Sequence, residues 1–292
     1  MATDKYTMDM AQGPLFRQIL TFAWPLFLSM LLQLCFHTAD LIVVGQFSSA
    51  EDLAAVGASG MIVSVFFSVF SGLAVGANVL ISKNYGAKKH NLVIKGSHTA
   101  IAIAIYGGIL LGIAGLICTD TFLHIVNVPD SLLVKSRNYV MLFFAGTPFA
   151  MLYNFGSAIL RSVGDSKRPL IFVAISGVVN IILNLVFVIV FKMGVVGVAL
   201  ATLLSNILSA FLIFQTLRHT HSSIGIKIPL IRINFSMFRS ILQIGVPAGL
   251  QSAMFGVSNL TILSSINTFG ENTIAGNTAA NSLEAICWIA TT

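Results

Sequence analysis

Residues 19–47, "ILTFAWPLFLSMLLQLCFHTADLIVVGQF", form one long apolar run with a single charged residue, Asp40. A helix needs roughly 20 apolar residues to cross the hydrocarbon core of a bilayer, which is about 30 Å thick. The run is long enough for that, and it holds no Lys or Arg that could neutralise Asp40. The sequence therefore predicts a membrane-spanning helix that carries a carboxylate into a region where water is scarce.

The whole chain has the composition of an integral membrane protein. Of its 292 residues, 56% are apolar and 9% are charged, and the mean hydropathy is +0.91. A soluble domain carries roughly 25% charged residues, so this chain has too few polar side chains to cover a globule in water. The net charge of +6 comes without a basic patch interleaved with aromatic residues, so nucleic acid is not an expected partner.

Seven apolar runs are long enough to cross a bilayer. They are residues 19–46, 53–82, 99–118, 138–160, 170–191, 195–217 and 240–267. An eighth run begins near Ile274 and is still incomplete at Thr292. The expected protein is all-helical and crosses the membrane many times.

The basic residues of the loops predict how the chain is oriented. If the N-terminus is cytoplasmic, 13 of the 16 Lys and Arg residues lie on the cytoplasmic side. Only Lys135, Arg137 and Lys192 then lie outside. Cytoplasmic loops carry an excess of Lys and Arg, so we expect a cytoplasmic N-terminus in a plasma-membrane protein.

An internal repeat predicts the domain organisation. Residues 16–28, "FRQILTFAWPLFL", match residues 238–250, "FRSILQIGVPAGL", at six positions with a constant offset of 222. The second copy begins after six spans, an even number, so both copies start on the same side of the membrane. We therefore expect a six-helix lobe at 1–217, a cytoplasmic linker at 218–237 and the truncated start of a second lobe at 238–292.

Polar residues at matching depth predict a site inside the first lobe. Counted from the outer boundary, Asp40, Asn184 and Thr202 each lie roughly 10 Å below the outer surface, and Asn180 lies one helical turn deeper than Asn184. A charged carboxylate near the bilayer centre costs about 2.5–3.5 kcal/mol. Taking up H⁺ or binding Na⁺ relieves that cost, which makes Asp40 the expected coupling residue. The alternative is a buried Asp that only hydrogen-bonds to neighbouring helices or lines the outer vestibule.

Four further residues are secondary candidates. His37 is one turn from Asp40 and is a possible proton partner, Gln33 is one turn further, and Glu284 is an acid in the incomplete eighth run. Pro25 removes a backbone hydrogen bond and is a candidate hinge in the first helix. The sequence holds no phosphate-binding loop, metal-ligand cluster or nucleophile–base pair. We therefore expect neither an enzyme nor a resident cofactor, and no metal apart from Na⁺ at Asp40.

Several motifs resemble those of the multidrug and toxic compound extrusion (MATE) family of transporters. They include "TADLIVVGQF" (38–47), "GLAVGANVLISKNYGAKK" (72–89), "ILRSVGDSKRP" (159–169) and "NIILNLVFV" (180–188). The resemblance implies two six-helix lobes, and export of amphipathic, often cationic drugs in exchange for H⁺ or Na⁺. It implies coupling roles for Asp40, Asn180, Asn184 and Thr202. Some relatives carry a second acid where this chain has Asn184, which slightly favours H⁺.

The resemblance leaves membrane lipids and the missing second lobe as the expected partners besides the drug. A lipid-linked precursor flippase is an alternative, but it would need a cationic cavity to hold phosphates, and the predicted interior of the first lobe shows none. A truncated half-transporter without activity is a second alternative. A seven-helix receptor is disfavoured by the repeat and by the distribution of basic residues.

Overall fold

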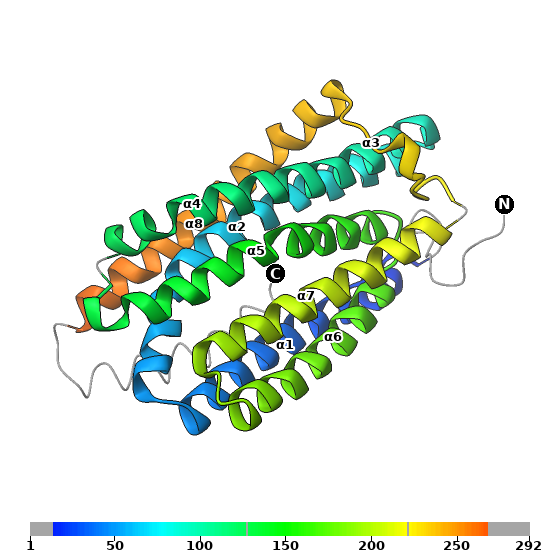
Figure 1. The fold of residues 1–292 in the computed structure, drawn as a ribbon. Helices are drawn as coiled ribbons and strands as arrows, with labels where there is room; N and C mark the ends of the chain where they lie inside the picture. Colours follow the sequence, from blue (N-terminus) through cyan, green and yellow to red (C-terminus); the bar gives the residue numbers. More distant parts are fainter. Residues whose placement is uncertain (1–13, 127, 221, 268–292) are drawn as a thin grey trace.

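The structure, a computed structural model, describes residues 14–126, 128–220 and 222–267. These residues form helices and no strand (Figure 1). The α-helices are α1 (Leu15–Phe47), α2 (Ala50–Gly86), α3 (His90–Ala102), α4 (Gly108–Ile125), α5 (Asp130–Arg161), α6 (Lys167–Leu185), α7 (Gly194–His219) and α8 (Phe235–Asn267). Two π-helical segments, η1 (Ile103–Gly107) and η2 (Val186–Val190), and a short 3-10 helix, η3 (Ile228–Leu230), complete the described part.

Six helical stretches are long and apolar enough to cross a membrane. They are Phe16–Phe47, Glu51–Gly86, His90–Ile125, Asp130–Arg161, Lys167–Val190 and Gly194–His219. The prediction of an all-helical polytopic membrane protein is thereby confirmed. The third stretch joins α3, η1 and α4 without a break and is much longer than the predicted run at 99–118.

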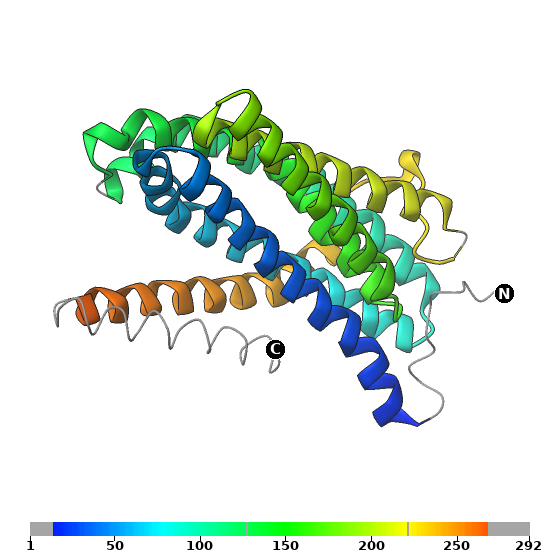
Figure 2. The same ribbon diagram turned by 90° about the horizontal axis from the view of Figure 1, so that it is seen from below.

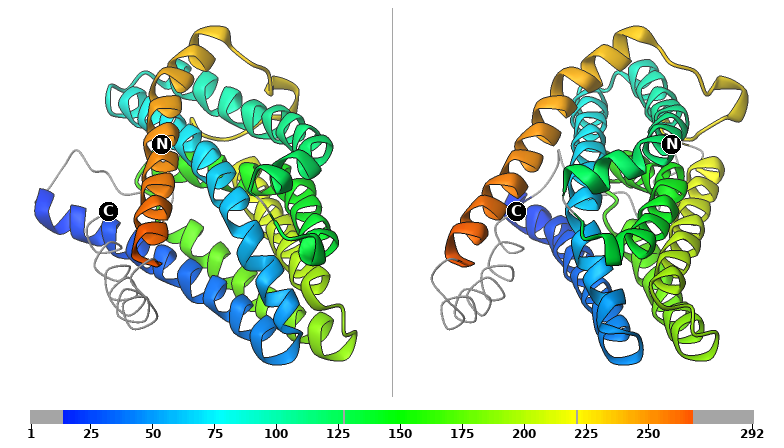
Figure 3. Two further views of the ribbon diagram at one scale, coloured as in Figure 1. Left: turned by 90° about the vertical axis from the view of Figure 1, so that its left-hand side faces the viewer. Right: turned by 60° about the vertical axis from the view of Figure 1, so that its left-hand side comes forward.

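The seventh predicted run, 240–267, lies within α8, which is not one of these six stretches. The eighth run, with Glu284, lies outside the described residues. Both α1 and α8 are 33 residues long, and each contains the proline of the sequence repeat, Pro25 or Pro247. The two helices nevertheless run in different directions (Figures 2 and 3).

The bundle is organised around α5, which packs against α7 on one side and against α2 and α4 on another. On the α7 side, α6 packs between α7 and α1; on the α2 side, α8 packs along α2 (Figures 1 and 3). The end of the bundle where α2, α5 and α7 finish carries Lys88, Lys89, Lys167, Arg168, Lys227 and Arg232 in or beside its connections. We call this the basic end, and the other the opposite end.

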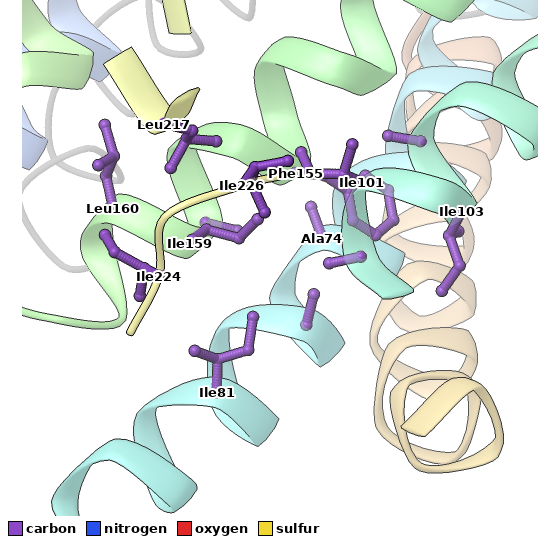
Figure 4. Close-up of a cluster of buried hydrophobic side chains, with 14 of the residues drawn as sticks. Ala74, Ile81, Ile101, Ile103, Phe155, Ile159, Leu160, Leu217, Ile224 and Ile226 are labelled. Atoms are coloured by element: carbon purple, nitrogen blue, oxygen red, sulfur yellow. The ribbon is translucent and has the colours of Figure 1, made fainter. Parts of the chain in front are cut away.

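A dry cluster of buried side chains fills the basic end (Figure 4). It includes Phe155 and Ile159 of α5, Leu217 of α7, and Ile224 and Ile226 of the segment that connects α7 to α8. All five are at most 2% exposed. We call this cluster the basic-end core; it fixes the ends of α2, α5 and α7 relative to one another.

The contact between α2 and α8 is made largely by backbone. A Cβ atom added to Gly72 would lie 2.2 Å from Gly249 Cα, and one added to Gly76 would lie 2.4 Å from the Ile241 carbonyl oxygen. A Cβ on Gly245 would likewise lie 2.8 Å from Leu73 Cα. The glycine pairs of the two helices therefore face each other, which is how small residues spaced by four let membrane helices approach closely.

Candidate functional site

The four polar residues that the depth count grouped together form one chain of hydrogen bonds. Asn184 Nδ2 of α6 donates to Asp40 Oδ1 of α1 and, over 3.2 Å, to Asn180 Oδ1 one turn away. Asn180 Nδ2 lies 3.4 Å from Thr202 Oγ1 of α7. We call these four residues the polar network; it joins α1, α6 and α7.

Close packing of α1 on α6 positions this network. A Cβ atom on Gly177 would lie 1.8 Å from Cε2 of Phe36, so the absence of a side chain at Gly177 leaves the space that the Phe36 ring occupies. Phe36 is one turn before Asp40, and Gly177 is about one turn before Asn180. The same contact therefore brings the carboxylate of α1 to the amides of α6.

The two asparagines of the network are buried, Asp40 and Thr202 are half-buried, and the hydrogen bonding of the network is incomplete. Asn184 is fully buried and Asn180 is 6% exposed. Asn184 uses Nδ2 for two acceptors, while its Oδ1 is buried and accepts no hydrogen bond among the described residues. A buried acceptor without a donor is costly. The carboxylate can take up a proton, and the carboxylate and the free amide oxygen can both act as ligands of a hard cation.

A layer of valines bounds the network toward the opposite end. Val43 and Val44 of α1, Val188 of η2 and Val198 of α7 form a cluster in which each side chain is at most 6% exposed. Each lies about one turn beyond a network residue of the same span. This valine layer separates Asp40 from the opposite end by apolar side chains.

One residue that the sequence analysis did not single out, Tyr139, extends the site toward α5. Tyr139 of α5 lies close enough to Asp40 for the two to interact electrostatically. Tyr139, Thr202 and Asn206 of α7 line a small cavity of about 20 Å³ between α5 and α7. A cavity of that size has room for about one water molecule. The predicted run 138–160 placed Tyr139 at the outer boundary, whereas α5 begins eight residues earlier, at Asp130, and this earlier start puts Tyr139 deeper in the bundle.

The secondary candidates lie apart from the network. His37 and Gln33 are exposed, and neither makes a hydrogen bond to the four network residues. Pro25 is buried within α1, where its carbonyl accepts a 2.7 Å hydrogen bond from Ser29 Oγ. It is 15 residues from Asp40, or roughly 22 Å along the helix axis.

No cluster of three or more His, Cys, Asp or Glu side chains occurs among the described residues. A hard cation at Asp40 would therefore take its remaining ligands from amide and hydroxyl oxygens, which Asn180, Asn184 and Thr202 can supply. A proton needs none of these ligands.

A polytopic helical bundle that holds a carboxylate and two buried amides between its helices defines a class: multi-pass membrane proteins with a polar network inside the bundle. Comparisons with known proteins narrow the class. The MatE family model matches residues 25–186, more than half of the chain. The chain therefore belongs to the MATE family of transporters.

Two curated relatives agree with this assignment. The probable multidrug resistance protein YpnP of Bacillus subtilis is 30% identical over 95% of this chain and 62% of its own length. The multidrug export protein MepA of Staphylococcus aureus is 25% identical over 90% of this chain and 58% of its own length. The chain thus spans about three fifths of the length of these relatives.

Solved structures show the same fold. A multidrug resistance MATE family transporter in an outward-facing conformation superposes with a TM-score of 0.91 and 24% identity, over 99% of this chain and 64% of that one. A MOP superfamily transporter from Pyrococcus furiosus superposes with a TM-score of 0.89 and 23% identity, over 99% of this chain and 64% of that one.

Proposed function

We propose that the chain is the N-terminal part of an antiporter that exports amphipathic or cationic drugs across the plasma membrane in exchange for H⁺ or Na⁺. In this proposal residues 1–217 are the first lobe, 218–237 the linker between lobes, and 238–292 the start of the second lobe. The substrate class comes from the relatives, whose names describe multidrug export.

The observation that carries the coupling role is the hydrogen bond from Asn184 to Asp40. It holds a carboxylate inside the bundle next to the buried, unpartnered Asn184 Oδ1. Such a site is electrostatically unfavourable when empty and is relieved when a cation enters. Binding of the ion would change the packing of α1 against α6 and α7, and drug release would follow from that change. We favour H⁺ because the network contains one carboxylate.

The charge distribution supports a cytoplasmic basic end. At the opposite end Lys135 Nζ lies 2.8 Å from Glu51 and 2.9 Å from Asp52, and Arg137 Nε lies 3.0 Å from Asp120. The basic residues of the loops are concentrated at the other end, which carries Lys88, Lys89, Lys167, Arg168, Lys227 and Arg232. The positive-inside rule counts Lys and Arg, so this distribution supports a cytoplasmic basic end.

The test is drug export by vesicles that contain the purified protein. We would read the source DNA beyond Thr292 and express the complete reading frame that contains this chain. Ethidium serves as the cationic substrate, and a pH gradient and a Na⁺ gradient are imposed in separate experiments. The gradient that drives export identifies the coupling ion.

The matched variants are Asp40→Asn and Asp120→Asn, which make the same chemical change inside and outside the bundle. Asp120 is a half-exposed acid paired with Arg137. We expect Asp40→Asn to abolish gradient-driven export and Asp120→Asn to leave it intact. An Asp40→Asn protein that exports ethidium at the full rate under the same gradient would refute the proposal.

A further inference from the structure

A second pocket lies at the basic end, outside the polar network. It has a volume of about 300 Å³ and lies between the start of α3 and the segment that connects α7 to α8. Its α3 side is lined by Asn91, Ile94, Lys95 and His98, whose spacing places them on one face of the helix. Arg232 of the connecting segment lines the other side. In Figure 1 this segment, drawn in yellow, runs beside α3.

Hydrogen bonds hold the two walls of the pocket together. His98 Nε2 lies 3.1 Å from the backbone N of Lys227, and His98 Nδ1 lies 2.8 Å from the carbonyl oxygen of Ile94. Because the Lys227 N–H can only donate, Nε2 accepts, and the proton of a neutral His98 is on Nδ1. The backbone N–H of Asn234 donates to Thr99 Oγ1 over 3.2 Å. These hydrogen bonds fix the two walls relative to each other, so the pocket has a defined shape.

The pocket is positively charged and has no acidic counterpart among the residues that the structure describes. Lys95 and Arg232 are exposed, and neither forms an ion pair with an acid in the described part of the chain. No Asp or Glu occurs at positions 53–119 or 166–267, so α3 and the connecting segment contain none. Two cations that share a pocket without an acid attract an anion.

The surroundings of the pocket are apolar, and its depth is that of the lipid headgroups. Ile94 and Leu230 line it and are exposed, as are Ile228 and Ile233 of the same segment. The helical stretch that contains Lys95, His90–Ile125, has 36 residues. At 1.5 Å per residue it is roughly 54 Å long, which exceeds the hydrocarbon core of about 30 Å, so we expect its first turns to lie among the headgroups. Cations next to exposed isoleucines at this depth match a molecule with a charged head and apolar chains.

We propose that this pocket binds the phosphate headgroup of an anionic phospholipid from the leaflet at the basic end. Lys95 and Arg232 contact the phosphate, Asn91 hydrogen-bonds to it, and the acyl chains lie along Ile94 and Leu230. The lipid would bridge α3 and the connecting segment, which leads into α8. The binding does not depend on transport; only the identity of the leaflet as cytoplasmic rests on the proposed function.

The test is lipid binding by the purified chain in detergent, without a gradient or a drug. Phosphatidylglycerol is compared with phosphatidylcholine, which has no net charge, and with glycerol phosphate, which has no acyl chains. Thermal unfolding and the mass of lipid-bound protein in native mass spectrometry are the two readouts. We expect phosphatidylglycerol alone to raise the Tm and to remain bound.

The variant is Lys95→Gln combined with Arg232→Gln, and the matched control is Lys83→Gln combined with Arg218→Gln. The control removes two exposed cations that do not line the pocket. Each basic residue contributes about fivefold to the affinity for anionic lipid, so we expect roughly 30-fold weaker binding in the variant and little change in the control. The mass readout applies even where the variant lowers the Tm by itself.

Three results would overturn the proposal. Equal stabilisation by phosphatidylcholine would remove the need for charge, and equal binding of glycerol phosphate would identify a site for free phosphate. Unchanged phosphatidylglycerol binding by the Lys95/Arg232 variant would place the lipid elsewhere. None of these results bears on export through Asp40, so the two proposals fail separately.

Discussion

Phe155 of the basic-end core and Asn184 of the polar network are both fully buried in one bundle, yet they depend on different contacts. Phe155 is surrounded by apolar side chains from α2, α5 and α7. This packing stabilises the fold because it excludes water from apolar surface. Asn184 makes two hydrogen bonds and leaves one oxygen unpaired. The basic-end core is therefore suited to holding helices together, and the polar network is suited to binding and releasing a small ion.

The largest difference between the two regions is expected when a carboxylate is placed in the basic-end core, whose apolar side chains offer no polar partner for it. Ile159 is fully buried in that cluster. The Ile159→Asp variant would bury an acid without a partner, and we expect it to lose about 3–5 kcal/mol of unfolding free energy or to fail to fold. Thermal unfolding in detergent measures the loss, and Ile159→Leu is the volume-conserving control. A folded Ile159→Asp protein of normal stability would show that water reaches this position, contrary to the expectation.

A cavity in the same core should have the next largest effect. Phe155→Ala removes a fully buried ring, and we expect a loss of about 3–5 kcal/mol. Phe211→Ala makes the same change at a side chain that is 59% exposed and should change the unfolding free energy little in detergent. Similar losses for both variants would contradict the assignment of Phe155 to a structural core.

The contact between α2 and α8 offers a third case, in which glycines rather than side chains bring two helices together. Gly72→Ala would place a Cβ atom 2.2 Å from Gly249 Cα, and we expect the resulting separation of the helices to cost about 1–3 kcal/mol. Gly57→Ala adds the same methyl group where nothing lies within 4 Å, so it should be neutral or slightly stabilising. Disulfide cross-linking between α2 and α8 reports the separation directly. A Gly72→Ala protein with unchanged cross-linking would count against close packing there.

The polar network should show the smallest change in stability when both partners are replaced together. Asn184→Leu alone leaves Asp40 without its donor, and we expect a loss of about 1–3 kcal/mol. The double variant Asp40→Leu and Asn184→Leu removes both polar groups and should be near neutral, because apolar replacement of a buried polar pair often is. Unfolding of the two single variants and the double variant gives the coupling between them. Additive losses would mean that the two side chains do not interact.

The sequence predicted the helical fold and the grouping of Asp40 with Asn180, Asn184 and Thr202, because both follow from counting residues along apolar runs. The same counting could not show that Gly177 admits the Phe36 ring, since that contact joins residues far apart in the chain. It missed Tyr139 because the apolar run begins at residue 138, whereas the helix itself begins at Asp130, so the count placed Tyr139 at the outer boundary. The π-helical segments η1 and η2 carry no local signal such as a proline, and the exposure of His37 depends on how α1 is rotated within the bundle.

The docked segment between α7 and α8 has a consequence for assembly. Fifteen residues separate His219 from Phe235, and a flexible linker of that length would allow its ends to move roughly 20 Å apart. Here Ile224 and Ile226 are buried in the basic-end core, and the backbone of Lys227 and Asn234 is bound to α3. Most of that freedom is removed before α8 meets α2. The docked segment therefore presents α8 to α2 at a high effective concentration, so the contact between their glycines needs less intrinsic affinity than it would after a flexible linker.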